Sequence, residues 1–396
     1  MGVLGEIFVK GGGVGALIVV EGEMSTMKRA HCILMGLLMA GAGLTGARAA
    51  EGYEAIRAVG LEGAGNEAAG EAWNKAAGAG PEEMLAILKA MNGGNPLAQN
   101  WLRAAVETVA DRARKGGRLP EADLAALVKD TSNDTAPRLL AFEMLMKDAP
   151  KVAEALRPGL LNDPAAELRL FAVAELLEEG QALKAKEDKK GAVAAFKKAL
   201  DGARDEEQIN ALAKGLRDLG EQVDLPKHFG FLMKWQLIAP FTNVDRGGFD
   251  QIFPPEVGVD LKAKYAGKGA EAVWVPFGSK DEYGMIDFNE PFGMLKEVTG
   301  YAYTEFEAGE ERTAEIRLGC KNGWKVWLNG KLLFGRDEYH RGMKLDQYKL
   351  PVTLKKGKNT LLVKCCQNEQ TEQWTVEWRF QLRICDATGT AILPKS

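Results

Sequence analysis

Side chains that could act as nucleophiles or general bases are few in this sequence. From residue 50 onward there are three serines, Ser132, Ser279 and Ser396, and two histidines, His228 and His340. Ser279 follows Phe-Gly, so it lacks the first glycine of a nucleophile elbow. A Ser-His or Cys-His pair would have to use one of these two histidines. The sequence therefore predicts a protein without catalytic activity.

One segment, residues 334–341, has the side chains that a carbohydrate site needs. Such sites combine an aromatic ring with a few polar groups near a loop. Tyr339 could stack on a sugar face, and Trp374, which follows a polar turn, is a second aromatic candidate. The predicted ligand-binding residues are Arg336, Asp337, Tyr339, His340, Arg341 and Trp374. The alternative is a structured loop in which Tyr339 is packed and the charged groups are solvated.

A metal or cofactor is not expected, with one exception. Histidines are scarce, and adjacent Cys365 and Cys366 lack the C-x-x-C spacing that places two thiolates on one ion. A structural calcium ion could use the loop carboxylates of Asp337, Glu338 and Asp346. Acidic loops are usually only solvated, so this remains the weaker interpretation.

Composition indicates a globular protein of two or three domains. The chain has 396 residues, of which 46% are hydrophobic and 27% charged, with a formal net charge of −4. Basic and acidic residues are interspersed along the chain. Nothing in this pattern favours a nucleic acid or an anionic membrane as a partner.

Residues 27–49 have the features of a signal peptide. Lys28 and Arg29 precede an apolar run over residues 32–46, and Ala47 and Ala49 are small residues at the positions that a signal peptidase reads, with cleavage expected after Ala49. The run is shorter than the ~20 residues of a membrane helix, although an uncleaved anchor is the alternative. We expect export, to a secreted, periplasmic or cell-envelope location, with no span after cleavage. Residues 1–26 are interpreted as an over-extended start.

The four cysteines after the signal all lie in the C-terminal half: Cys320, Cys365, Cys366 and Cys385. In an exported chain they permit two disulfides in three connectivities. Adjacent Cys365 and Cys366 on a strand would point to opposite faces. Buried thiols that fill a core are the equally weighted alternative.

Residues 50–226 are rich in Ala, Leu, Glu and Lys and predict eight or nine helices with short connections. Proline stands at expected first helical positions after Asn95 and Asp163, which would act as caps, and after Gly80 and Leu119. Residues 138–146 align with residues 169–177, each starting with Arg-Leu. This pattern resembles HEAT repeats, and Gly180 to Ala199 has a spacing similar to a tetratricopeptide unit. The resemblance implies an armadillo-like α-superhelix; an irregular helical bundle is the alternative.

Residues 227–396 are richer in glycine, aromatic and β-branched residues than the segment before them, and this composition predicts antiparallel strands. Asn329-Gly330 between two apolar runs indicates a hairpin with a type I′ turn. Residues 348–354 and 361–365 flank a Lys-rich turn. At the end, Trp378, Phe380, Leu382 and Ile384 alternate, as one buried sheet face requires.

This half resembles the galactose-binding-like jelly roll, the β-sandwich found as the sugar-binding domain of family 2 glycoside hydrolases. The matching stretches are residues 235–241, 325–331, 354–364 and 380–384. They are hairpin and core positions, so the resemblance implies the fold and says little about a sugar.

Two functions from different classes follow. In the first, the sandwich binds a glycan or another cell-envelope component and the helices position it. In the second, the helical repeats bind a protein as an envelope scaffold, and the sandwich binds no sugar.

Overall fold

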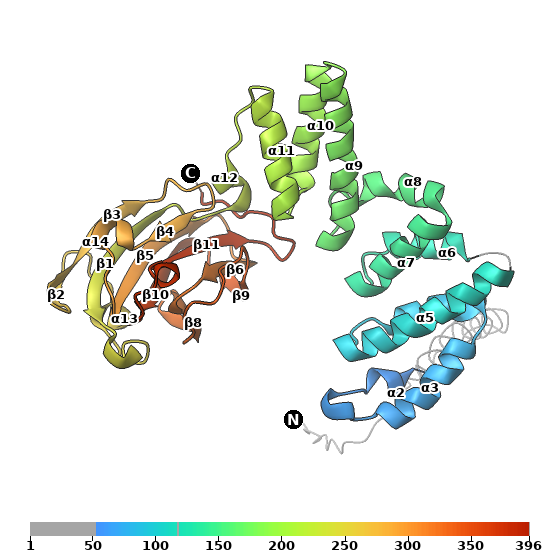
Figure 1. Cartoon of the computed structure of the whole chain (residues 1–396), viewed down its shortest axis with the longest axis horizontal. Helices are drawn as coiled ribbons and strands as arrows, with labels where there is room; N and C mark the ends of the chain where they lie inside the picture. Colours follow the sequence, from blue (N-terminus) through green and yellow to red (C-terminus); the bar gives the residue numbers. More distant parts are fainter. Residues whose placement is uncertain (1–52, 117–118, 396) are drawn as a thin grey trace, which may run out of the picture. The chain divides into compact units, whose positions relative to one another are not determined.

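The computed structural model describes residues 53–116 and 119–395 (Figure 1). The expected over-extended start (1–26) and signal peptide (27–49) lie outside the described residues. Helices come first and antiparallel sheets follow, as the fold class predicted. The chain divides into two compact units, residues 1–120 and 121–396, and each is described by itself. Within the described residues, no helix is both long and apolar enough to cross a bilayer.

The first unit consists of helices that range from single turns to the 21 residues of α5. Asn95 accepts a hydrogen bond from the Ala98 amide at 2.9 Å, and Pro96 starts α5, so the predicted cap is confirmed. Pro81 likewise starts a 3₁₀ turn. The elements are α2 (Glu54–Arg57), η1 (Leu61–Gly63), α3 (Asn66–Gly78), η2 (Pro81–Glu83), α4 (Met84–Ala90) and α5 (Pro96–Gly116).

The helices of the second unit pack in sequence order before the sheets begin. They are α6 (Glu121–Lys129), α7 (Thr135–Asp148), α8 (Pro150–Leu160), α9 (Ala166–Ala185), α10 (Lys189–Gly202), α11 (Glu206–Asp218) and α12 (Leu225–Phe229). Phe196 of α10 fills the space beside Gly180 of α9 and Gly215 of α11, where a Cβ atom would lie within 3.0 Å of its ring. Among the described residues of both units, nine helices of seven or more residues precede the sheets, in agreement with the predicted number.

A buried ion pair joins two of these helical segments. Arg138 and Arg169 occupy the fourth position of α7 and α9. The Arg138 guanidinium donates to Asp163 and, at 2.8 Å, to the carbonyl of Val128 at the end of α6. Arg169 donates to the Asp163 carbonyl and to Gly202 at the end of α10. The two aligned arginines thus satisfy carbonyl groups of neighbouring segments.

Asp163 does not act as the simple helix cap that the sequence predicted. Helix α9 begins at Ala166, so Pro164 precedes the helix instead of starting it. The Asp163 carboxylate accepts from the Ala165 amide at 2.8 Å and from Arg138. The buried guanidinium draws this carboxylate inward, because neither charge could be buried alone at an acceptable cost in free energy.

In the described part of the chain, eleven strands form two antiparallel sheets that face each other across an apolar core (Figure 1). The larger sheet has the order β2 (Lys264–Ala266), β3 (Glu271–Gly278), β1 (Lys234–Thr242), β5 (Val298–Ala308), β10 (Gly357–Gln367), β7 (Gly323–Leu328) and β8 (Lys331–Arg336). The smaller has the order β4 (Met285–Asp287), β11 (Arg379–Cys385), β6 (Arg312–Cys320) and β9 (Tyr348–Leu354). Short helices α13 (Pro254–Val257) and α14 (Asn289–Phe292) and the 3₁₀ turns η3 (Val244–Arg246) and η4 (Gln373–Thr375) lie in connections.

The predicted hairpin is confirmed and the following unit is more complex than expected. Asn329 and Gly330 both have positive φ, 52° and 78°, and join β7 to β8. Strand β9 coincides with the predicted run 348–354, whereas β10 contains the run 361–365 but already begins at Gly357, within the predicted turn. The two strands belong to different sheets. The turn between them therefore carries the chain from one layer to the other.

The last strand, β11, is buried on both faces. Trp378, Phe380, Leu382 and Ile384 enter the core between the sheets, as predicted. On the outer face, Arg383 donates to the Phe229 carbonyl of α12 at 2.9 Å and to Asp346. Helical residues of the same unit therefore cover part of the smaller sheet.

Replacement of Arg138 by Leu tests the buried ion pair. The variant removes the guanidinium that donates to the Asp163 carboxylate and to the Val128 carbonyl, and both acceptors stay buried. We expect the free energy of unfolding of the second unit to fall by about 3–5 kcal/mol in urea titrations followed by circular dichroism. Lys214→Ala is the control, because Lys214 pairs with Asp218 in an exposed site; it should change stability little. Equal effects of the two substitutions would contradict the assignment.

His228 of α12 gives the fold a dependence on pH. Burial, reinforced by the nearby charge of Arg204, lowers the pKa of His228 from 6.5 to about 4. Between these values the unfolded chain binds a proton that the folded chain does not. Stability therefore falls as the pH falls through this window, by at most about 1.4 kcal/mol per pH unit.

We expect His228→Gln to flatten that dependence. Between pH 6.5 and 4.5 the wild-type chain should lose about 2 kcal/mol more stability than the variant, as measured by urea unfolding at each pH. Parallel stability–pH curves for the two proteins would show that another group is responsible.

Candidate functional site

Several connections meet at one end of the sandwich because of the strand registers. Strands β1 and β10 both end beside the start of β5, where Thr242 and Gln367 pair with Val298. The start of β7 and the end of β8 lie next to the end of β10, and β6 ends where β11 begins. The connections after β1, β6, β8 and β10 therefore share this end, which we call the rim.

Buried amide side chains hold the rim together. Gln367 donates to three carbonyls of the β10–β11 connection, those of Thr375, Val376 and Glu377, at 3.1–3.3 Å. The side-chain oxygen of Gln367, Oε1, accepts from Asn322 Nδ2 at 3.2 Å and from the backbone amide of Asn368. Because these groups are shielded from water, each satisfied bond adds to the order of the connection.

Asn243 links the network to the predicted binding segment. The Asn243 Nδ2 donates to the backbone carbonyl of Gln367 at 2.9 Å and to the Tyr339 hydroxyl at 3.1 Å. The Arg246 guanidinium lies over the Tyr339 ring, 5.2 Å from its centroid. Burial raises the pKa of Tyr339 far above its ordinary value. Tyr339 is therefore partly buried, with its hydroxyl held by Asn243 and its ring covered in part by Arg246.

His340, in the connection between β8 and β9, contacts the β6–β7 and the β10–β11 connections. Its amide donates to the Lys321 carbonyl at 2.7 Å, and its Nε2 lies 2.8 Å from Asn368 Oδ1. The ring meets the edge of the Trp374 indole with 5.3 Å between centroids. Burial lowers the pKa of His340, so the neutral imidazole dominates at neutral pH.

Trp374 is the aromatic side chain that the rim exposes. It lies in η4 and is 55% exposed, although large aromatic side chains usually lose most of their contact with water on folding. Lys321 Nζ donates to the Trp374 carbonyl at 2.9 Å and is paired with Glu377. Lys321 thus holds the backbone of Trp374 in place, while the indole remains accessible to solvent.

Arg246 and Glu369 add a charged pair beside these rings. They are bonded at 2.5 Å, and both are about half exposed. The charge of Arg246 helps to lower the pKa of His340, and His340 in turn helps to lower the pKa of Glu369. We call Arg246, His340, Glu369 and Trp374 the rim surface.

The connection that carries Arg246 is anchored across the larger sheet. Residues 243–263, which we call the strap, cover the outer face of this sheet. Lys364 is fully buried beneath it and donates to the carbonyls of Phe249 and Gln251 and to Glu256 at 2.8–2.9 Å. A buried ammonium group requires such partners, so Lys364 fixes the path of the strap.

The other three predicted residues have contacts of their own. Arg336 and Arg341 both pair with Glu338, at 3.7 and 3.2 Å. Asp337 lies near Gly323, and burial raises its pKa. The structure therefore brings Tyr339, His340 and Trp374 together. Asp337 and Tyr339 both lie beside Gly323, whereas Arg336 and Arg341 are paired with Glu338.

The calcium candidates do not converge in the described part of the chain. Both Asp346 oxygens accept from arginines, Arg317 and Arg383, at 2.6 Å. Asp337 and Glu338 take part in the contacts above. Over residues 53–116 and 119–395, no group of three or more His, Cys, Asp or Glu side chains is placed to hold a metal ion.

The scarce candidate nucleophiles are engaged locally. Ser132 Oγ lies 2.6 Å from Asp130, and Ser279 Oγ accepts from the Asp281 amide. His228 is half-buried in α12, and His340 bonds Asn368. Ser396 lies outside the described residues. Neither described serine is hydrogen-bonded to a histidine.

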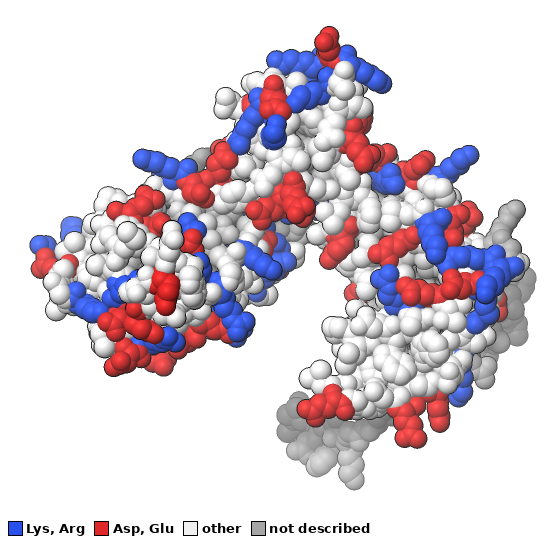
Figure 2. Space-filling model, in the orientation of Figure 1, with Lys and Arg blue, Asp and Glu red and all other residues white. Residues whose placement is uncertain are grey.

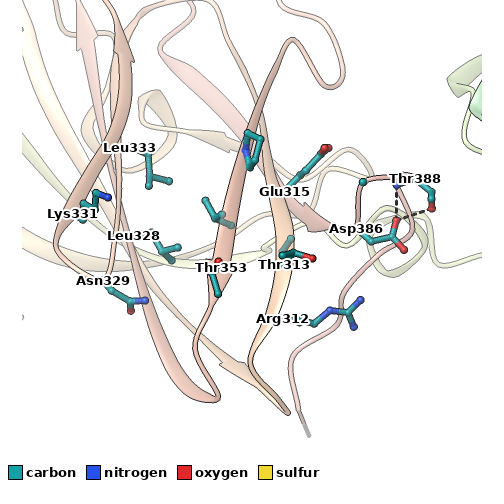
Figure 3. Close-up of a pocket in the computed structure, with 14 residues that line it drawn as sticks. Arg312, Thr313, Glu315, Leu328, Asn329, Lys331, Leu333, Thr353, Asp386 and Thr388 are labelled. Atoms are coloured by element: carbon teal, nitrogen blue, oxygen red, sulfur yellow. Dashed lines mark hydrogen bonds between the residues drawn. The ribbon is translucent and has the colours of Figure 1, made fainter. Parts of the chain in front are cut away.

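A hollow of about 860 Å³ lies at another edge of the sandwich (Figure 3). It runs from Leu328, Asn329 and Lys331 at the β7–β8 hairpin past Thr353 to Asp386. The Asp386 carboxylate accepts from Thr388 and is already hydrogen-bonded within its own turn. On the face drawn in Figure 2, positive and negative side chains are intermixed over the described residues.

Comparisons with known proteins find only distant likenesses. No protein-family model matches the chain, and no curated protein matches it. Solved structures that resemble it include the GH31 alpha-xylosidase from Xanthomonas citri, at 10% identity and a TM-score of 0.21, over 30% of this chain and 15% of that one. A GH2 beta-galacturonidase from Eisenbergiella tayi matches at 9% identity and a TM-score of 0.22, over 39% and 25%. This chain thus spans a quarter or less of the length of either glycoside hydrolase.

Sequence reasoning missed the side chains that build the rim. Asn243, Asn322, Gln367 and Asn368 are all buried. Each lies at or just after the end of an apolar strand, and an amide at that position could have indicated a buried hydrogen-bonding role. Arg246 and Glu369 carry no local signal, because their pairing joins positions more than a hundred residues apart.

Replacement of Gln367 by Leu tests the amide network. The variant keeps the side-chain size but removes the donors to three buried carbonyls. We expect a loss of about 2 kcal/mol in unfolding free energy and faster hydrogen exchange over residues 368–378. Gln373→Leu, an exposed position in the same connection, is the control. Unchanged exchange in Gln367→Leu would show that the connection is held by other contacts.

Proposed function

We propose that this chain is an exported, non-catalytic binding protein that takes a carbohydrate on the rim surface. The observation that carries the proposal is the position of Trp374. Its indole is more than half exposed, while its neighbours His340 and Lys321 hold it in place. An ordered, exposed aromatic ring is costly in water and is typical of a recognition site.

The chemistry around Trp374 favours a carbohydrate ligand. The apolar C–H face of a sugar ring can pack on an indole. Arg246 offers fixed donors and Glu369 offers acceptors, which together match the hydroxyl groups of a sugar. Since these two groups neutralise each other, the surface does not select a strongly charged ligand.

Tyr339 enters the proposal as a supporting residue. The packed-loop interpretation of Tyr339 agrees with its bond to Asn243 and with its cover by Arg246. Stacking is assigned to Trp374 instead. Removal of the Tyr339 ring would disturb Arg246 and Asn243, so its effect on binding would be indirect.

The rest of the chain would present this surface. We propose that residues 27–49 direct export to a secreted, periplasmic or cell-envelope location, and that the sandwich is a galactose-binding-like jelly roll. The helices are proposed to be HEAT- or tetratricopeptide-like repeats that position it. The aligned arginines and the Arg138–Asp163 pair support a repeated helical unit.

A glycan-array screen of the full chain tests the carbohydrate proposal. We expect Trp374→Ala to weaken binding of the glycan hits by at least tenfold, about 1.4 kcal/mol. Trp374→Phe should retain part of the affinity, because it keeps an aromatic face. Isothermal titration with the best hit provides the measurement.

Two results would contradict the proposal. If no glycan binds a folded wild-type chain, the sandwich is not a lectin-like module for the sugars tested, and the helical repeats become the candidate surface for a protein partner. If Trp374→Ala binds like wild type while Leu332→Ala, at an exposed position on edge strand β8, loses binding, the site lies elsewhere.

A further inference from the structure

Two of the four described cysteines face each other across the sandwich. Cys320 ends β6 of the smaller sheet, and Cys365 lies in β10 of the larger sheet. Their sulfur atoms are 3.9 Å apart within the apolar core between the sheets. Both thiols are free in this structure and almost fully buried.

The other two cysteines have different neighbours. Cys366 points to the opposite face of β10, where its sulfur lies 3.5 Å from the Thr299 hydroxyl. Cys385 lies on β11, with its sulfur 4.0 Å from the Glu315 carbonyl. Of the three connectivities that the sequence left open, the structure favours the one that contains Cys320–Cys365, because these two sulfur atoms are in contact.

We infer that Cys320 and Cys365 form a disulfide that joins the two sheets when the chain folds in an oxidising environment. The oxidant is a disulfide of a small thiol or of a dithiol carrier. One cysteine thiolate attacks it, forms a mixed disulfide and releases one reduced thiol. The second thiolate then displaces the other thiol, so two electrons pass to the oxidant and the two protons leave with its thiols.

The geometry requires only a local adjustment. A disulfide bond is about 2 Å long, so the sulfur atoms must approach by roughly 2 Å. Rotation of the side chains and a small approach of the strands at this end of the core would supply this movement. The bridge would close a long loop and restrict the unfolded chain, which stabilises the folded one.

Burial determines when the bond can form. Burial raises the pKa of the Cys365 thiol well above its ordinary value, so the reactive thiolate is scarce in the folded chain. An external oxidant also has almost no access to either sulfur. Oxidation therefore accompanies folding, and the folded reduced protein reacts slowly.

The bridge would lie directly below the rim. Cys320 is followed by Lys321 and Asn322, and Cys365 lies two residues before Gln367. These three neighbours hold the connections that carry His340 and Trp374. The disulfide would tie together the two strand ends on which the rim depends. This inference concerns covalent structure, so it stands or falls independently of glycan binding.

The test is to refold the full chain in a glutathione redox buffer and to map its disulfides by mass spectrometry after trypsin digestion without reduction. We expect a linked pair of peptides, residues 318–321 and 365–379. Relative to protein refolded with dithiothreitol, the oxidised protein should melt about 5 to 10 °C higher. Native reduced protein placed in the same buffer should form the link much more slowly.

Because Cys365 and Cys366 share one tryptic peptide, two variants separate them. Cys366→Ala should keep the link and the higher melting temperature, and Cys365→Ala should lose both. Absence of the linked peptide from refolded wild-type protein with native circular dichroism would overturn the inference. Persistence of the link in Cys365→Ala would also overturn it, because the partner would then be Cys366.

Discussion

The rim of the sandwich depends on the hydrogen bonds of the buried Gln367 side-chain amide. Where strands end, backbone carbonyls lose their ladder partners and must find other donors if water cannot reach them. Gln367 supplies donors to three successive residues of one connection, and its side-chain oxygen accepts from Asn322 of the β6–β7 connection and from the backbone amide of Asn368. A single side chain thus converts several strand ends into one ordered surface.

The same requirement explains the other buried polar groups of the second unit. Lys364 anchors the strap through two carbonyls and Glu256, and Arg138 joins α6 to the segment before α9. In each case a cation is buried only where carbonyl and carboxylate oxygens surround it. Such groups add little net stability compared with apolar replacements, but they penalise any arrangement that leaves them unpaired. They therefore select one path for each connection, and the positions of Arg246 and Trp374 follow from these paths.

Apolar packing and polar anchoring have separate roles in the sandwich. The alternating residues of β11 and the inward faces of β1 and β10 bring the two sheets together. That packing leaves the ends of the strands undefined, and the amide network at the rim defines them. An exposed indole can be kept in one orientation there because its backbone is bonded on the buried side.

The sequence by itself determined features that depend on neighbouring residues. Alternation predicted the buried face of β11, Asn329-Gly330 predicted the hairpin through its two positive φ angles, and adjacency placed Cys365 and Cys366 on opposite faces. Only the tertiary structure decided the rest, because those features join residues far apart in the chain. It placed β9 and β10 in different sheets, covered Tyr339 with Arg246, and put Cys320 opposite Cys365. Local pattern specifies which face of a strand is apolar, but the partner of each buried polar group is chosen only when the layers close.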